Sequence, residues 1–264
     1  MVSFKTNIDY SEELRVIDEI ASVIGAYRSV RLEEIESVKL LNRVDTKYWF
    51  SVSKLPEILS ELLFHYEVLE IEGSRIQNYH TEYFDTPGDD FYLDHHNGRS
   101  NRIKIRKRAY SDTGIHFLEI KRKSNKGRTL KTRTSTDALN CGLEGQDAEF
   151  LREHTNVCPT VLEQKICNRF KRITLINREG CERCTIDFEL QFDDGRRQEE
   201  LEQITIVELK QQSISSRSRL GEVLKTHQIR GTRFSKYCMG RAIMHPELKR
   251  NRLKPTLLKL KQIS

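Results

Sequence analysis

The segment 101-NRIKIRKRAY-110, the turn SDTG and the segment 115-IHFLEIKRK-123 decide the fold. Neighbouring residues of a β-strand point to opposite faces, so residues two apart share a face. The first segment therefore has one wholly basic face, made of Arg102, Lys104, Arg106 and Arg108. Ile103 and Ile105 lie on its other face. Two such segments joined by a short polar turn predict a β-hairpin with a basic face.

The basic face continues on the neighbouring strands. Glu119, Lys121 and Lys123 share one face of the second segment, and 128-RTLKTRTST-136 adds Lys131 and Arg133 two residues apart. A single strand of this kind is usually a solvated outer face. Several adjacent ones are harder to explain that way, because like charges opposite each other destabilise a strand pair by roughly 0.2 to 1 kcal/mol. The pattern predicts an anionic ligand that offsets this repulsion.

Further strand-like segments bring the total to about eight, the size of a small closed barrel. They begin at residues 42, 79, 165, 181 and 204. Helical periodicity predicts an N-terminal helix at about 9–27 and C-terminal helices at about 215–249, while the final LKPTLLKLKQ packs outside or frays. The expected fold class is α+β, an eight-stranded antiparallel β-barrel at about 42–212 with flanking helices. One domain is expected to span residues 1–264.

Composition excludes several classes of protein. Hydrophobic residues make up 37% and charged residues 32%, which is typical of a globular chain, and the formal net charge is +6. No apolar run long enough for a transmembrane helix and no signal-peptide pattern is present, so a cytoplasmic protein is expected. Of the six cysteines, Cys181 and Cys184 form a C-x-x-C without a second pair for zinc, which predicts reduced structural thiols.

Carboxylates also occur within the basic strands. Asp187 and Glu189 lie two apart in TIDFEL, and Glu208 lies two before Lys210 in IVELK. Hard oxygen ligands beside cations suggest Mg²⁺ or Mn²⁺ shared with a phosphate-bearing substrate. The alternative is that these carboxylates only pair with the arginines.

The order of the motifs resembles a known family. NRVDTKYWF, EYFDT, RIKIRKRAY, FLEIKRK, LKTR, RCTID, IVELK and RFSKY follow one another over about residues 42–240. This order is similar to the catalytic domain of the vacuolar transporter chaperone (VTC) family, polyphosphate polymerases among the triphosphate tunnel metalloenzymes. The resemblance implies an eight-stranded tunnel open at both ends, with ATP and polyphosphate as ligands and Mn²⁺ or Mg²⁺ as cofactor.

The matching motifs also imply roles for individual residues. The expected catalytic residues are Arg106, Arg108, Lys121, Arg183 and Lys236. The expected phosphate-binding residues are Lys47, Arg102, Lys104, Lys131, Arg133, Arg169, Lys210 and Ser235, of which Arg102 and Lys104 match less specific positions. Glu208 is the expected metal ligand.

The implied reaction is transfer of the γ-phosphate of ATP to a growing polyphosphate chain, with release of ADP. One alternative is a tripolyphosphate or nucleoside triphosphate hydrolase on the same fold. Hydrolases and cyclases of the superfamily carry E-x-E-x-K on the first strand, but Arg43 stands at the first glutamate position here and Asp45 at the second, which favours the polymerase. A second alternative is a non-catalytic polyanion-binding module. Nucleic acid is not expected, because few aromatic residues interleave the basic ones.

Overall fold

A computed structural model describes residues 10–35, 44–125, 129–179, 182–212 and 217–263. The long strands are β2 (Val44–Ser51), β4 (Gln77–Asp85), β5 (Arg102–Tyr110), β6 (Ile115–Lys123), β7 (Thr129–Ser135), β8 (Glu163–Asn177), β9 (Glu182–Asp193) and β11 (Ile204–Gln211). Three short strands are added, β1 (Ser29–Val30), β3 (Glu67–Leu69) and β10 (Gln198–Leu201). Both the hairpin and the total of about eight long strands follow the sequence pattern.

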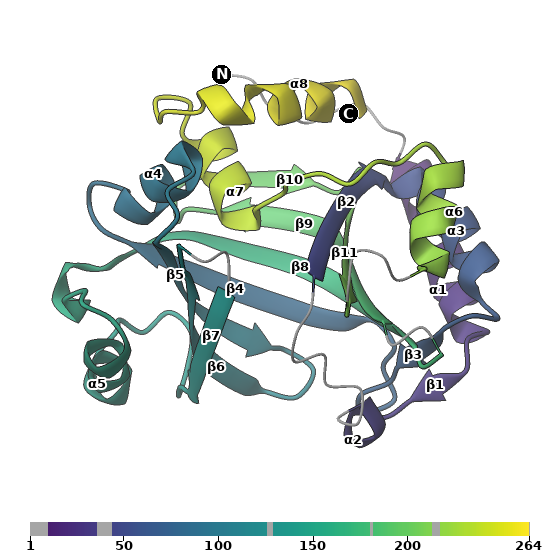
Figure 1. Cartoon of the computed structure of the whole chain (residues 1–264), viewed down its shortest axis with the longest axis horizontal. Coiled ribbons are helices and arrows are strands. Elements are labelled where there is room, and N and C mark those ends of the chain that lie inside the picture. The colour runs from purple at the N-terminus through teal and green to yellow at the C-terminus, as the bar shows by residue number, and fades with distance from the viewer. Residues whose placement is uncertain (1–9, 36–43, 126–128, 180–181, 213–216, 264) are drawn as a thin grey trace.

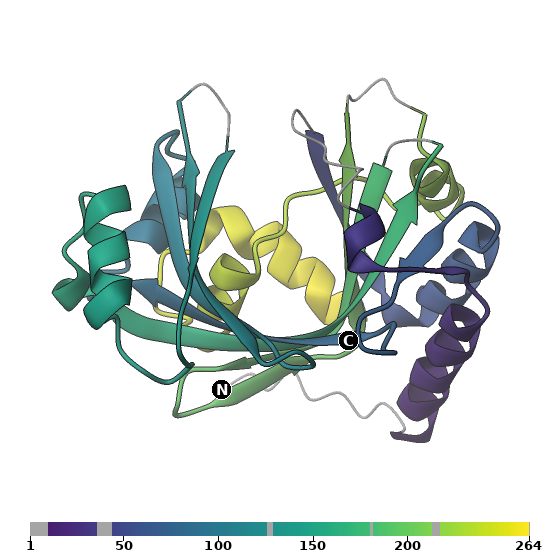
Figure 2. The same cartoon turned by 90° about the horizontal axis from the view of Figure 1, so that it is seen from below.

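The long strands form one antiparallel sheet in the order β2-β11-β9-β8-β4-β5-β6-β7. Figure 2 shows that this sheet curls, so that β5, β6 and β7 rise on one side and β2, β11 and β9 rise on the other. We call the inner side of this curl the concave face and the other side the convex face. The α+β class and the eight-stranded antiparallel sheet with flanking helices are confirmed.

The curled sheet departs from the expected barrel in one respect. In the described part of the chain, β2 and β7 stand at the two ends of the sheet and do not pair with each other. The outer edge of β2 is instead engaged by the segment before the C-terminal helices, because the Thr232 amide donates a hydrogen bond to the Lys47 carbonyl (2.7 Å). An edge strand used in this way has fewer free groups for pairing with β7.

Helices cover the sheet on several sides (Figure 1). They are α1 (Tyr10–Gly25), α2 (Leu32–Ile35), α3 (Leu55–Leu62), α4 (Asp90–Asn97), α5 (Gly145–His154), α6 (Arg219–Thr226), α7 (Lys236–Met244) and α8 (Lys254–Ile263). Short 3₁₀ turns occupy Val52–Lys54, Pro159–Val161 and Asn251–Leu253. The final segment thus forms an ordered helix, α8, anchored by Leu257 and Leu260. No described helix is both long and apolar enough to cross a membrane.

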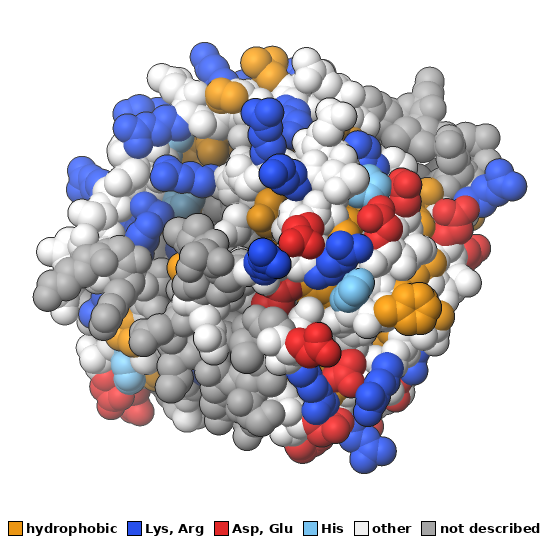
Figure 3. Space-filling model, turned by 45° about the vertical axis from the view of Figure 1, so that its right-hand side comes forward, with side chains coloured by type: hydrophobic (Ala, Val, Ile, Leu, Met, Phe, Trp, Pro, Cys, Tyr) orange, Lys and Arg blue, Asp and Glu red, His pale blue; other side chains and the backbone are white. Residues whose placement is uncertain are grey.

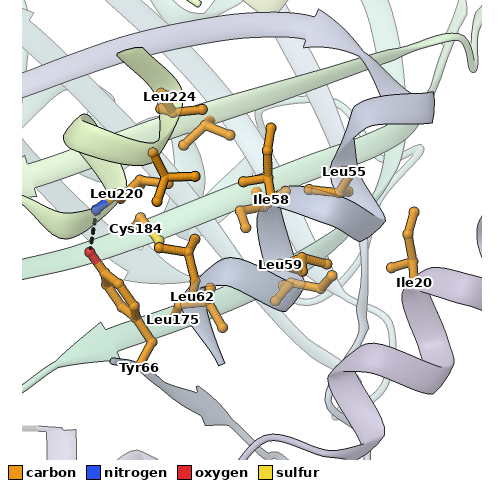
Figure 4. Close-up of a cluster of buried hydrophobic side chains, with 14 of the residues drawn as sticks. Ile20, Leu55, Ile58, Leu59, Leu62, Tyr66, Leu175, Cys184, Leu220 and Leu224 are labelled. Atoms are coloured by element: carbon orange, nitrogen blue, oxygen red, sulfur yellow. Dashed lines mark hydrogen bonds between the residues drawn. The ribbon is translucent and has the colours of Figure 1, made fainter. Parts of the chain in front are cut away.

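The largest core lies on the convex face, where α1, α3 and α6 pack against β8, β9 and β11. Helix α3 has its apolar residues at helical spacing, and Leu55, Ile58, Leu59 and Leu62 are almost fully buried (Figure 4). Burying each such side chain contributes about 1.5 to 3 kcal/mol. The Leu220 amide at the start of α6 donates a hydrogen bond to the Tyr66 hydroxyl (3.0 Å), which ties α6 to the same core. This core holds one side of the curl.

Helix α7 packs against a second core built on β4, β8 and β9. A Cβ on Gly240 would lie 2.5 Å from a ring carbon of Phe192, so glycine allows the helix to approach the sheet closely. The Tyr237 hydroxyl donates a hydrogen bond to Asp85, whose carboxylate also accepts from the Phe91 and Tyr92 amides of α4. These contacts fix the start of α7, where Ser235 and Lys236 lie.

Helix α5 covers the convex face of β5 and β6. The Lys107 ammonium is buried there, 2.8 Å from Asp147 of α5, and it donates to the carbonyls of Cys141 and Gly142. Because Lys107 points outward, its neighbours Arg106 and Arg108 point to the concave face.

Candidate functional site: a basic concave face

Strand register brings the predicted basic residues side by side on the concave face. Lys104 lies opposite Lys121, which in turn lies opposite Lys131 on β7, and Arg102 lies opposite Lys123. Few opposite charges separate these groups, apart from Glu119 between Arg106 and Arg133. The predicted juxtaposition of like charges is therefore real on this side of the curl.

The other side of the curl adds further cations. Lys210 lies opposite Arg183 on β9, and Glu208 lies opposite Lys47 on β2. The Glu208 carboxylate receives Lys47 Nζ at 2.7 Å on one oxygen and Lys210 Nζ at 3.1 Å on the other. Although burial by itself would raise it, these lysines hold the pKa of Glu208 well below its usual range.

Charges on the two sides of the curl influence one another. Arg106 and burial lower the pKa of Lys121 well below its usual range, while Glu208, on the opposite side, favours the charged form. The Lys104 ammonium donates a hydrogen bond to Ser235 Oγ (2.8 Å) at the start of α7. The residues expected from β2, β5, β6, β11 and α7 therefore belong to one electrostatic site.

Two buried carboxylates hold several of these cations in place. Glu119 pairs with Arg106 Nε (2.7 Å) and with Lys131. Asp187 accepts from both Arg172 Nε and Nη2 (2.5 and 2.7 Å) and from Lys236. Burial opposes ionisation of both carboxyls, but the neighbouring cations lower their pKa values well below the usual range. Each carboxylate thus orients two cations toward the concave face.

Aromatic rings support the same cations from one end of the site. Tyr79 and Phe170 stack with their centroids 5.2 Å apart, and Arg172 lies over Tyr79 at 4.7 Å. The Lys236 ammonium lies 4.2 Å from the Phe170 centroid. Cation–π contacts of this kind restrict the side chains without neutralising their charge. The guanidinium and ammonium groups are consequently pre-positioned.

The structure brings most of the predicted residues to the concave face. They are Lys47, Arg102, Lys104, Arg106, Arg108, Lys121, Lys131, Arg133, Arg183, Glu208, Lys210, Ser235 and Lys236. In the view of Figure 3, Lys and Arg lie beside Asp and Glu on the right-hand part of the surface, whereas the upper left part carries mainly Lys and Arg.

Arg169 is not brought there, contrary to the prediction. It lies opposite His80 on the convex face and is exposed. The concave arginine of β8 is Arg172, which the prediction missed. The sequence contained a usable signal, because Arg169 lies an even number of residues before Ile173 and Leu175 on the same strand. The side chains of those two residues fill the convex core, so Arg169 is expected to point to the convex face as well. Arg172 lies two residues after Phe170 and therefore points with it to the concave face.

Glu189 also departs from the expected alternation. Its backbone has a positive φ of 49°, and its carboxylate pairs with Lys171 at 2.8 Å. Strand β8 shows a register shift against β9 between Arg169 and Lys171, close to this point. A bulge of this type redirects side chains locally, so Asp187 faces the site without Glu189.

The donor groups present fit a metal ion that is shared with substrate. Glu208 supplies an ionised carboxylate, and one or two carboxylates plus substrate phosphates are the usual ligands of Mg²⁺. In the described ranges, no three His, Cys, Asp or Glu side chains converge on the concave face. These residues therefore do not form a metal cage without substrate.

The fold and this face define the chain as a curled antiparallel-sheet protein built around a cation-rich inner surface. Residues 42–245 match the VTC domain family, and the chain belongs to that family. The resemblance inferred from motif order is thus confirmed. No curated protein sequence matches the chain significantly.

The chain is similar to several solved structures. A Bacillus halodurans protein described as a candidate adenylate cyclase is 15% identical, with a TM-score of 0.49 and coverage of 74% of this chain and 94% of that chain. A Hippeastrum protein reported to have a dominant triphosphatase activity is 14% identical, with a TM-score of 0.47 and coverage of 76% and 94%. The PH1819 protein of Pyrococcus horikoshii is 14% identical, with a TM-score of 0.44 and coverage of 78% and 99%.

Proposed function

We propose that this protein is an ATP-dependent inorganic polyphosphate polymerase. The observation that carries the proposal is the convergence of cations from both sides of the curled sheet on one concave face. A chain of phosphates is a ligand that could offset repulsion among so many adjacent charges. Membership of the VTC domain family supports the same conclusion.

The proposed reaction depends mainly on alignment and charge. Arg106, Arg108 and Arg183 would bind phosphate oxygens through planar forks, while Lys121 and Lys236 supply compact ammonium charges. The terminal oxygen of the growing chain is itself the nucleophile, so no side chain has to form a covalent bond. Lysine and arginine groups that are fixed before substrate arrives stabilise charge that develops during phosphoryl transfer.

The remaining cations would hold the rest of the polyanion. Lys47 and Lys210 flank Glu208, while Lys104 and Ser235 form a polar contact between β5 and α7. Glu208 would hold Mn²⁺ or Mg²⁺, which when bound neutralises charge on phosphate oxygens. The further cations on β5, β6 and β7 would extend the binding surface along the product.

The products formed from ATP test this proposal. The purified protein incubated with ATP and Mn²⁺ should yield ADP and a polyphosphate ladder on a stained polyacrylamide gel, with little orthophosphate. Glu208→Gln should lower kcat by roughly 10²- to 10³-fold, the usual range for loss of one transition-state-stabilising group. Glu189→Gln is the matched control, because its carboxylate pairs with Lys171 outside the site.

Other product patterns would contradict the polymerase. ADP accompanied by an equal amount of orthophosphate, without polymer, would indicate a hydrolase. Tight polyphosphate binding without turnover, unchanged in Glu208→Gln, would indicate a non-catalytic binding module. Thermal melting of each variant should accompany the assays, so that loss of activity is distinguished from loss of folding.

Binding of a triphosphate should depend on pH in a defined direction. Burial lowers the pKa of Lys236 to about 7 and that of Lys131 to about 8, although each lysine faces a carboxylate. Bound phosphates favour the charged ammonium forms and would raise both pKa values, so binding takes up protons. Affinity should be greatest below pH 7 and should fall as pH rises through 7 and 8.

Titration calorimetry with tripolyphosphate in buffers of different ionisation enthalpy measures this proton uptake. At a pH between the two lysine pKa values, the wild-type protein should take up protons, and Lys236→Met should take up fewer. Net proton release, or affinity that increases with pH over this range, would show that the lysines are already charged in the free protein.

A further inference from the structure

Three side chains of metal-binding type meet on the convex face of the sheet. His80 and Glu82 are two residues apart on β4, and Cys167 lies opposite Glu82 on β8. One ligand atom from each residue lies within 4.8 Å of the ligand atoms of the other two. Along their strands these three side chains alternate with the side chains that face the basic site. The cluster is therefore separate from the concave face.

Two buried polar atoms of these side chains lack a hydrogen-bond partner among the described residues. They are Nε2 of His80 and Oε2 of Glu82. The Glu82 side chain is fully buried, and its other oxygen, Oε1, accepts a hydrogen bond from the Asn140 amide at 2.8 Å. A buried polar atom without a partner is costly, so such atoms usually have a ligand, an ion or a water. A metal ion bound by the three side chains could serve as that partner.

The surroundings of the sulfur support the same interpretation. Cys167 is 9% exposed, and its Sγ accepts a hydrogen bond from Gln164 Nε2 at 3.0 Å. Hydrogen bonds to a ligating atom orient it and tune its basicity. Asp193 lies opposite Cys167 on β9, which adds negative charge near the cluster.

The protonation states of two of the side chains affect metal binding in opposite directions. Burial, reinforced by Arg169, lowers the pKa of His80 to about 4, so its imidazole is neutral and able to bind a metal near pH 7. Burial raises the pKa of Cys167 to about 12, so metal binding must release the thiol proton. Arg169 and Lys107 also lie near the cluster and disfavour a cation, while Glu82 and Asp193 favour one.

We propose that His80, Glu82 and Cys167 bind a divalent transition-metal ion, for which Zn²⁺ is the best chemical match. Thiolate and imidazole ligands select zinc over Mg²⁺ or Mn²⁺. Zinc bonds of about 2.0 to 2.3 Å place tetrahedral ligand atoms roughly 3.3 to 3.8 Å apart, so a small convergence of the three atoms completes the geometry. The fourth position is left for water or Asp193.

A metal ion at this position would join β4 to β8. These two strands carry Tyr79 and Phe170 on their concave face, where the stacked rings support Arg172 and Lys236. The proposed ion therefore stabilises the strand pair directly behind one end of the basic site. This role does not depend on which reaction the concave face performs.

Cobalt substitution of the full chain tests the site. The metal-free protein titrated with Co²⁺ should develop a thiolate-to-cobalt charge-transfer absorption with one equivalent, and Zn²⁺ should displace Co²⁺ and raise the melting temperature. Cys167→Ser should abolish the absorption. His80→Gln should weaken Co²⁺ binding by more than the roughly 10- to 100-fold that loss of an outer hydrogen bond costs.

Two control variants separate this site from other metal binding. Cys158→Ser removes an exposed thiol and should leave the charge-transfer band unchanged. Glu208→Gln alters the concave face and should also leave it unchanged. Absence of the band in the wild-type protein, or its persistence in Cys167→Ser, would overturn the proposal. If Cys167→Ser does not fold, an undiminished zinc-induced rise in melting temperature in His80→Gln would overturn it as well.

Discussion

A Lys121→Met variant is expected to be more stable than the wild-type protein and much less active. In the described part of the chain no carboxylate lies within ion-pair distance of Lys121, and Arg106 and burial lower its pKa. Removing this ammonium relieves repulsion and should raise the free energy of unfolding by roughly 1 kcal/mol, about 2 to 4 °C in melting temperature. Losing one preorganised positive group should lower kcat/KM for ATP by about 10²-fold or more.

The opposite directions of the two effects make this result diagnostic. Substitutions that act through general unfolding lower both the stability and the activity. In a strained functional site, by contrast, a substitution that relieves the strain raises the stability and lowers the activity. Lys171→Met is the matched control, since Lys171 is on the convex face and pairs with Glu189. It should change both quantities little. A destabilised Lys121→Met protein, or one with full activity, would show that Lys121 has a structural role.

Arg106→Met is expected to be the most destabilising single substitution in the site. Glu119 is fully buried and is held by Arg106 and Lys131. Removing the arginine leaves the carboxylate with one partner, and breaking a buried ion pair on one side typically costs about 3 to 5 kcal/mol. Urea unfolding should show this loss as a lower midpoint.

The double variant Arg106→Met/Glu119→Gln provides the control. Because it removes both charges, it should be more stable than Arg106→Met alone, and the two effects should not add. It should still lack activity if Arg106 binds phosphate. Additive losses of stability would show that the two side chains do not depend on each other, which would contradict the paired geometry.

Much of the fold follows from local sequence patterns. The register of β5 and β6 is set by a short turn between two alternating segments, so Arg102 and Lys123 could be expected opposite each other. The convex cores follow from apolar periodicity, as in α3. The absence of pairing between β2 and β7 in the described part of the chain could not be predicted in the same way, because the edge of β2 is engaged by the distant residue Thr232.

The candidate site could be predicted wherever the alternation of side chains along each strand was applied. This alternation correctly grouped the cations of β5, β6 and β7, whereas a motif comparison selected Arg169 in place of Arg172. Applying the alternation from Ile173 back along β8 would have placed Arg169 on the convex side. The turn of Glu189 away from Asp187 had no such signal, since it results from a local positive φ.

The sequence by itself determined that several strands have a basic face, because side-chain alternation is a property of each strand alone. Only the tertiary structure decided which distant groups meet. Asp187 holds Arg172 and Lys236, which approach it from β8 and α7, and Glu208 joins lysines of β2 and β11. These pairings depend on how the sheet curls and where α7 packs, and those are set by long-range burial in the cores.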